Sequence, residues 1–266
     1  MGETDAPIAV RIGARRLVGR VSGAGEPTVV LETGLGAAGA SYEDIARRVV
    51  AFTRVVSYDR AGLGGSDPAP KPRTVDDIVA DLHLLLHGAH IPGPYALVGH
   101  SLGGLTVRLY RERYPAEVAA MVLVDAAHED QQQRFLALLP SESANELAEL
   151  ARLRDAWSVE WLDPAANDEG IDNVANSAIM RVCGTLGATP LLVISRGRPD
   201  RDATKYPAGF VESVEQAWQR MQLELARLSS NSQRVIASGS GHVVNRDAPE
   251  VIVAGIRQAV MGARCT

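Results

Sequence analysis

A serine set between glycines joins an apolar run to a helical pattern near the middle of the chain. The stretch 99–104 reads Gly-His-Ser-Leu-Gly-Gly, the apolar run 95–98 precedes it, and a helical pattern over 102–114 follows. A turn this tight forces the serine into strained backbone. It also brings strand and helix so close that glycine is needed at Gly99 and Gly103. The stretch therefore predicts a buried strand, a sharp turn and a helix packed directly against that strand.

Apolar strands alternate with helical patterns on both sides of this turn. The expected strands cover 8–12, 15–21, 28–32, 54–58, 95–98, 119–124, 190–194 and 233–237. The expected helices cover 41–52, 74–90, 102–114, 211–228 and 249–260. Such alternation predicts an α/β fold: a twisted, mostly parallel sheet with helices on both faces and a hairpin of the first two strands at one edge.

The alternation breaks over residues 129–187. This segment is charged, rich in Gln and Ala, and without a convincing strand. A helical insertion between two sheet strands is typical of a lid over the edge of the sheet where ligands bind. We therefore expect a core of residues 1–128 and 188–266 and a lid of residues 129–187. Phe135, Trp157 and Trp161 in this insertion line an apolar pocket or form the insertion's own small core.

The composition disfavours several classes of protein. The 266 residues are 46% hydrophobic and 22% charged, which is typical of a soluble domain. The net charge of -5 leaves no basic patch for nucleic acid, and the apolar runs are too short to span a bilayer. Residues 1–7 are acidic and do not resemble a secretion signal, and Cys183 and Cys265 make no disulfide framework. We expect a cytoplasmic protein without nucleic-acid or membrane partners; the sequence predicts no oligomeric state.

The setting of Ser101 is that of a nucleophile. A serine hydroxyl is a poor nucleophile until a base accepts its proton. Of the six histidines, only His242 follows the last expected strand, after the small residues 238–241, in a loop that can reach the turn. We therefore expect Ser101 to act as nucleophile and His242 as its base. His100, inside the turn itself, is expected to be structural.

The order of motifs along the chain resembles that of the α/β-hydrolase superfamily. Gly34-Leu35 follows an expected strand, Asp-Arg-Ala-Gly-Leu-Gly-Gly-Ser spans 59–66, the serine turn spans 99–104, and His-Val-Val-Asn-Arg-Asp-Ala-Pro spans 242–249. The resemblance covers nearly the whole chain outside the insertion, and the loop 59–66 is typical of the esterase, lactonase and haloperoxidase-like branch.

The resemblance implies acyl transfer through the serine, with no cofactor or metal. In this family two backbone N–H groups bind the oxyanion, and the matching positions are Leu35 and Leu102. Thr33 stands where the family usually has histidine, but the donor is a backbone group. Asp59 and Arg60 are expected to shape the wall of the cleft and to take no part in the chemistry.

Two aspartates compete for the role of the acid that orients His242. Both lie between serine and histidine in chain order, as this family requires. Asp200 holds the commoner family position but stands in an arginine-rich loop that also fits a solvated surface. Asp125 directly follows the strand 119–124, where some lactonases carry their acid and where a carboxylate is readily buried. We favour Asp125, keep Asp200 as the alternative, and place Asp202 behind both.

A rival interpretation rests on the stretch 34–39, which fits the Gly-x-Gly-x-x-Gly pattern of dinucleotide-binding folds. Asp59 ends the next strand, at the place of the ribose-binding acid. The expected hairpin before this strand argues against it, and it leaves Ser101 and His242 unexplained. An NAD(P)-binding oxidoreductase is therefore the lesser alternative.

A metal pair is a further alternative. His83 and His87 have the spacing of two ligands on one helix face. No carboxylate motif accompanies them, so a half-exposed helix face is the better interpretation.

Together these features predict a serine hydrolase. We expect it to cleave carboxylic ester or lactone bonds of small to medium, largely apolar substrates. The main alternative is a small-molecule receptor on the same fold with slow or no turnover, because a fold does not fix a function.

Overall fold

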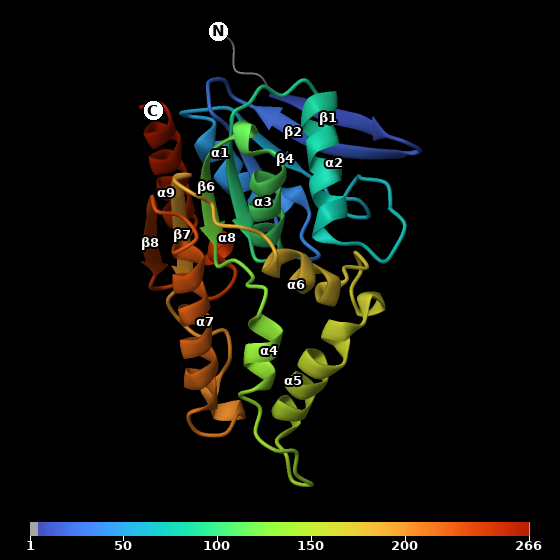
Figure 1. Cartoon of the computed structure of the whole chain (residues 1–266), viewed down its shortest axis with the longest axis vertical. Helices are drawn as coiled ribbons and strands as arrows, with labels where there is room; N and C mark the ends of the chain where they lie inside the picture. The colour runs from blue at the N-terminus through green and yellow to red at the C-terminus, as the bar shows by residue number, and fades with distance from the viewer. Residues whose placement is uncertain (1–4, 266) are drawn as a thin grey trace.

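The computed structural model describes residues 5–265; residues 1–4, part of the stretch expected to carry no secretion signal, lie outside the described residues. An eight-stranded sheet in the order β1-β2-β4-β3-β5-β6-β7-β8 forms its centre (Figure 1). The strands are β1 (Asp5–Ile12), β2 (Arg15–Ser22), β3 (Thr28–Glu32), β4 (Val55–Tyr58), β5 (Tyr95–His100), β6 (Val118–Val124), β7 (Leu191–Arg196) and β8 (Ser232–Ala237). β2 pairs antiparallel with β1 and β4, and all other neighbours are parallel. The expected fold class and edge hairpin are confirmed.

Helices cover both faces of the sheet. On one face lie α1 (Glu43–Val49) and α9 (Pro249–Ala263), and on the other lie α2 (Val75–Gly88), α3 (Leu102–Arg113) and the end of α7 (Phe210–Ala226). In β3, Val29 and Leu31 belong to the apolar core under α1 and α9, and Val30 belongs to the apolar core under α2 and α3. This follows from the period of two along a strand, so a fully apolar strand is buried on both faces.

Two details differ from the expected elements. The helix expected at 41–52 is only seven residues long, because a 3-10 turn over Gly39–Tyr42 precedes α1. The Gly39 N–H donates to the carboxylate of Asp59, which holds the chain in that turn. A short helix, α8 (Val244–Asp247), follows the loop after β8 and was not expected.

Three helices lie between β6 and β7. They are α4 (Gln131–Leu136), α5 (Ala148–Ser158) and α6 (Asn173–Arg181), and within residues 5–265 this segment adds no strand to the sheet. In Figure 1, α4 and α5 project beyond the sheet beside α7. Phe135 of α4 and Trp157 of α5 pack with Phe210 and Trp218 of α7 in a third apolar core. These two helices therefore share a core with the main domain.

The turn from β5 into α3 has the predicted close packing. Ser101 has φ 51° and ψ −119°, in the left-handed region that strains a residue with a side chain. A Cβ on Gly99 would lie 2.4 Å from the carbonyl oxygen of Gly103, and a Cβ on Gly103 would lie 2.4 Å from that of Glu32. The two glycines are required because β3, β5 and α3 nearly touch here.

His100, the last residue of β5, ties this turn to the loop after β8. It is buried, and its Nε2 lies 2.8 Å from the carbonyl oxygen of His242. A carbonyl only accepts hydrogen bonds, so the Nε2–H group donates. Burial, with the neighbouring His242 ring, lowers the pKa of His100 to about 4. His100 is therefore neutral at neutral pH.

The close packing of the turn predicts opposite effects for two glycine substitutions. Gly103→Ala should lower the free energy of unfolding by about 1–3 kcal/mol, because backbone must move. The matched change Gly262→Ala lies in α9, where a Cβ meets nothing within 4 Å. It should leave stability unchanged or raise it by up to about 1 kcal/mol, from helix propensity. Urea denaturation measures both, and equal stabilities would contradict the close approach.

The buried His100 predicts a loss of stability in acid. Its ordinary pKa is 6.5, so between about pH 6.5 and pH 4 the unfolded chain binds a proton that the folded chain does not. Stability is therefore full above this window and falls through it, by about 3 kcal/mol in all. His100→Gln keeps a donor for the carbonyl but does not titrate. Between pH 7 and pH 4, urea denaturation should show a loss of unfolding free energy that is about 3 kcal/mol smaller in the variant than in the wild type. An equal loss in both proteins would refute the neutral, buried state of His100.

Candidate active site

Three side chains from three loops form a hydrogen-bonded chain at one edge of the sheet. Nε2 of His242 lies 3.0 Å from Oγ of Ser101, and Nδ1 lies 2.6 Å from Oδ2 of Asp125. These residues follow β5, β6 and β8, parallel strands whose carboxyl ends meet at the same edge. The structure thus brings together the serine, the histidine and the favoured aspartate.

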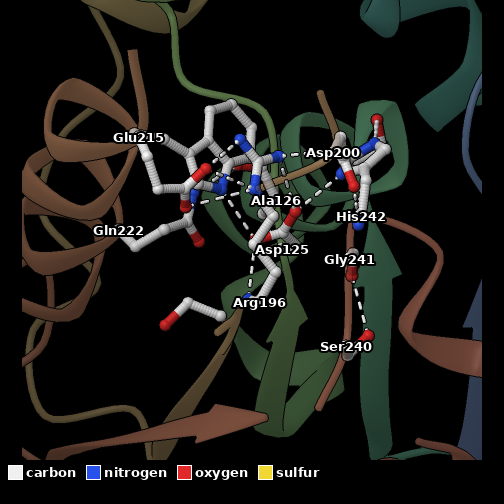
Figure 2. Close-up of polar contacts among 12 residues, drawn as sticks. Asp125, Ala126, Arg196, Asp200, Glu215, Gln222, Ser240, Gly241 and His242 are labelled. Atoms are coloured by element: carbon white, nitrogen blue, oxygen red, sulfur yellow. Dashed lines mark hydrogen bonds and ion pairs between the residues drawn. The ribbon is translucent and has the colours of Figure 1, made fainter. Parts of the chain in front are cut away.

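The Asp125 carboxylate is fully buried and accepts four hydrogen bonds. Oδ1 accepts from Nε1 of Trp218 at 2.7 Å and from the Arg196 backbone at 3.0 Å. Oδ2 accepts from His242 and from Nη1 of Arg196 at 3.3 Å. Figure 2 shows Asp125 lying between α7, which carries Glu215, and His242. The carboxylate is therefore held in one orientation toward the imidazole.

The electrostatics of Asp125 favour its charged form. Burial alone would raise the pKa of Asp125, but the hydrogen bond to His242 and the positive charge of Arg196 outweigh it and lower the pKa below its usual value. Asp125 also has φ 41°, a strained conformation, and Gln222 donates to the carbonyl of the next residue, Ala126, at 2.8 Å. A strained, ionised and fully partnered carboxylate is typical of a functional position.

Asp200 lies nearby but contacts a different part of His242. Its Oδ1 accepts from the backbone N–H of His242, and its Oδ2 lies 3.1 Å from Nη1 of Arg196. Asp202 is exposed, and its carboxylate bonds to Thr204. Neither side chain reaches the imidazole, so Asp200 positions the loop that carries the histidine.

The loop after β3 lies against the serine. A Cβ on Gly34 would be 3.3 Å from Cβ of Ser101, and Leu35, Ser101 and Leu102 line one hollow of about 80 Å³. The N–H of Leu102 opens α3 and has no acceptor within the helix. Within residues 5–265, the N–H of Leu35 has no acceptor either. Leu35 and Leu102, the residues expected to supply the oxyanion donors, therefore both lie beside the serine.

A buried ion pair holds this loop in place. The Arg60 guanidinium donates to the carbonyls of Thr33 and Gly34 at 2.7 and 2.6 Å. Glu169 accepts from Arg60 at 2.7 and 2.8 Å and from the Gly36 N–H at 2.7 Å. Arg60 thus anchors the loop after β3, a role beyond the expected shaping of the cleft wall. Glu169 was not predicted because it lies 109 residues from Arg60 in sequence.

The same contacts answer the dinucleotide interpretation. The carboxylate of Asp59 accepts from the N–H groups of Gly39 and Gly65 at 2.8 and 2.9 Å, so it is not available to a ribose. The Gly36 N–H, which would face a pyrophosphate, is taken by Glu169. β3 also lies inside the sheet, after a hairpin, and does not open the domain. The residues do not fit a dinucleotide.

Ser101 and His242 open onto a hollow of about 200 Å³. Phe135, Trp157 and Trp161 from the segment between β6 and β7 line it, so Phe135 and Trp157 serve both the third core and this hollow. A larger hollow of about 720 Å³ lies over β2, β4 and α1, but neither Ser101 nor His242 lines it. The side-chain chemistry therefore places the candidate site at the smaller hollow.

Glu117 is a carboxylate partner of the histidine pair on α2, whereas the sequence indicated no carboxylate motif there. Nε2 of His87 lies 3.1 Å from Glu117, and Nδ1 of His83 lies 3.5 Å from it. The three donor atoms lie within 4.8 Å of one another, and two imidazoles with a carboxylate can hold a zinc-like ion. Tyr110 also donates to Glu117 at 2.6 Å, so hydrogen bonds within the cluster already satisfy the carboxylate.

Two smaller expectations concern cysteines and membranes. Cys183 and Cys265 are both free thiols. In the described part of the chain, no helix combines the length and apolarity that crossing a bilayer requires.

Curated proteins match most or part of this chain in sequence. YqjL, an uncharacterized protein of Bacillus subtilis (strain 168), is 26% identical over 225 residues, which cover 85% of this chain and 80% of YqjL. Two further curated relatives align over only 18% and 38% of their own lengths.

Solved structures resemble the whole chain. An esterase from Thermogutta terrifontis superposes with a TM-score of 0.64 at 18% identity, covering 98% of this chain and 99% of the esterase. An enol-lactonase from Burkholderia xenovorans LB400 superposes with a TM-score of 0.65 at 20% identity, covering 95% of this chain and 99% of the lactonase. Likeness at such identities shows the fold alone.

A family model described as alpha/beta hydrolase fold matches residues 27–170, more than half of the chain. The matched region contains β3 through β6 and the serine turn. The chain belongs to the α/β hydrolase fold family.

Proposed function

We propose that the protein is a serine hydrolase that cleaves carboxylic ester or lactone bonds through an acyl-enzyme on Ser101. The observation that carries this proposal is the unbroken chain from Ser101 Oγ through His242 to Asp125, with distances of 3.0 and 2.6 Å. This geometry matches the requirement that a nucleophile touch its base and that a third group orient the base.

Each group has a role in both halves of the reaction. Ser101 attacks the carbonyl carbon while His242 takes its proton, and His242 then gives that proton to the leaving alkoxide. Asp125 holds the imidazole in one tautomer and stabilises the imidazolium. Water, deprotonated by His242, then attacks the acyl-enzyme, and the proton returns to Ser101 as the carboxylic acid leaves. The net reaction consumes one ester bond and one water, so the chain's own residues suffice.

The oxyanion is assigned to the N–H groups of Leu35 and Leu102. Both line the hollow beside Ser101 and lack other acceptors among the described residues. Donors fixed in advance toward the developing negative charge are each worth a few kcal/mol of the barrier. The Arg60–Glu169 pair supports this role because it fixes the loop that carries Leu35.

The segment 129–187 is assigned as a lid between the core segments 1–128 and 188–266. It supplies Phe135, Trp157 and Trp161 to the hollow that contains Ser101. That hollow, at about 200 Å³, is smaller than the roughly 300–1,000 Å³ of sites for drug-sized ligands. Small substrates therefore fit best.

The proposed roles predict a sharp difference among four substitutions. Ser101→Ala should abolish hydrolysis of 4-nitrophenyl esters and lactones. Asp125→Asn should lower kcat by about 10²–10⁴-fold, because the imidazole loses its charged partner. Asp200→Asn should lower it far less, and Asp202→Asn, an exposed control, should not change it.

Initial rates on a panel of these substrates measure the effects. If Asp125→Asn stays active while Asp200→Asn does not, the acid is Asp200. Labelling of Ser101 by a fluorophosphonate probe without turnover of any substrate would favour a receptor.

The loop contact predicts a role for Glu169 in turnover. Glu169→Gln keeps a similar side-chain shape but weakens the bonds to Arg60 and the Gly36 N–H, so the oxyanion loop should loosen. We expect kcat to fall about tenfold with KM nearly unchanged. Asp168→Asn removes the same charge from the exposed neighbouring residue and should have no effect. A thermal melt confirms folding, and an unchanged kcat in folded Glu169→Gln would refute the role.

A further inference from the structure

Arg201 has a guanidinium without an acceptor at the candidate active site. It follows Asp200 in the loop after β7, is only partly exposed, and lines the same hollow as Ser101 and His242. The ring centre of Trp157 lies 5.3 Å from its guanidinium carbon, and Asp200, Glu215 and Tyr206 act on its charge from beyond hydrogen-bond distance. Within residues 5–265 it makes no hydrogen bond or ion pair. A cation in this position has donors to offer to a ligand.

The neighbouring Arg196 shows the contrast. It bonds to Asp125, Asp200 and Glu215, and it stacks on the ring of Trp218. The carboxylates of Asp125, Asp200 and Glu215 thus have hydrogen-bond donors in Arg196 and His242, and within residues 5–265 none of them bonds to Arg201. Burial lowers the pKa of Arg201, yet arginine stays charged at neutral pH. A partly buried charge without a hydrogen-bonded partner is costly.

A second donor in this hollow also lacks a partner. Nε1 of Trp161 is buried and, among the described residues, has no hydrogen-bond acceptor. Trp161 lines both the hollow that contains Arg201 and the smaller one that contains Leu35 and Leu102. A buried N–H group without an acceptor costs free energy unless a ligand or water supplies one. Arg201 and Trp161 thus both line the hollow that contains Ser101, and within the described residues neither side chain has a hydrogen-bond acceptor.

We propose that Arg201 binds a free carboxylate of the substrate, and that the preferred substrates are small esters or lactones that carry this second acidic group. The inference rests on the proposed function and replaces the expected apolar substrate with an anionic one. Hydrolysis of such a hemiester by water yields a dicarboxylate and an alcohol. Trp161 supplies a further N–H to an oxygen of the same substrate.

A carboxylate fits better than a phosphate. The planar guanidinium can donate two parallel hydrogen bonds to a carboxylate. Asp200 and Glu215 already lie near Arg201, and both form ion pairs with Arg196. A single added negative charge is tolerated beside Arg201 more readily than the double charge of a phosphate monoester. The small volume of the hollow favours short diacids.

Two esters of equal length test the preference. In 4-nitrophenyl hemiglutarate a carboxylate replaces the terminal methyl of 4-nitrophenyl pentanoate. Rates are corrected for the enzyme-free reaction, which a neighbouring carboxylate speeds. The wild type should favour the hemiglutarate in kcat/KM by about tenfold or more. Arg201→Gln should remove that preference while the rate on the pentanoate stays within about threefold. Arg227→Gln, at an exposed arginine that ends α7, should keep it.

Binding without turnover separates this inference from the proposed function. Calorimetry on Ser101→Ala should show glutarate binding that Ser101→Ala/Arg201→Gln loses. If the wild type hydrolyses neither ester but glutarate binds through Arg201, the hydrolase proposal fails and the anion site stands. If both esters react equally, or Arg201→Gln slows both equally, the anion site is refuted and the hydrolase stands. Inorganic phosphate binding more tightly than glutarate would overturn the choice of carboxylate.

Discussion

The close approach of three backbones at the end of β3 is the constraint on which the site depends. Gly103 lets the start of α3 touch the Glu32 carbonyl, and Gly99 lets β5 run directly beneath it. Ser101 is held in a left-handed conformation between them. Glu32 also contributes its side chain to the site. Its carboxylate accepts hydrogen bonds from Arg60 at 2.7 Å and from Tyr58. Backbone contact and buried charge thus position Ser101 and its neighbouring loop together.

Two buried arginines organise the rest of the site, each in a different way. Arg60 fixes the loop that carries Leu35 and links it to Glu169. Arg196 fixes Asp125 and Asp200, which approach His242 through the ring and the backbone. Both guanidinium groups are balanced by carboxylates, as buried charges must be. Arg201 differs because, within the described residues, no carboxylate bonds to it. This difference is the basis for the proposed carboxylate-binding role of Arg201.

The predictions that agree with the geometry of the structure rest on residues close together in the sequence. The glycines around Ser101 and the small residues before His242 are read within a few positions of the residue concerned. Asp125 was favoured because a residue that ends an apolar strand is buried, and burial is what the structure shows. The partners of these residues were not predicted. Trp218 lies 93 residues from Asp125, and the carboxylate beside His83 comes from a turn 34 positions later. No spacing rule connects such positions.

The sequence by itself determined the fold class, the strained serine and the histidine loop, because strand and helix periodicity and the demand for glycine act over neighbouring residues. Tertiary structure alone decided which carboxylate meets the imidazole and which segment holds the loop that carries Leu35. It also decided that, within the described residues, Arg201 lines the hollow beside Ser101 without a hydrogen bond or ion pair. These outcomes depend on how loops from separate strands converge at one edge of the sheet. There burial makes each unpaired charge costly, and so selects the pairs that form.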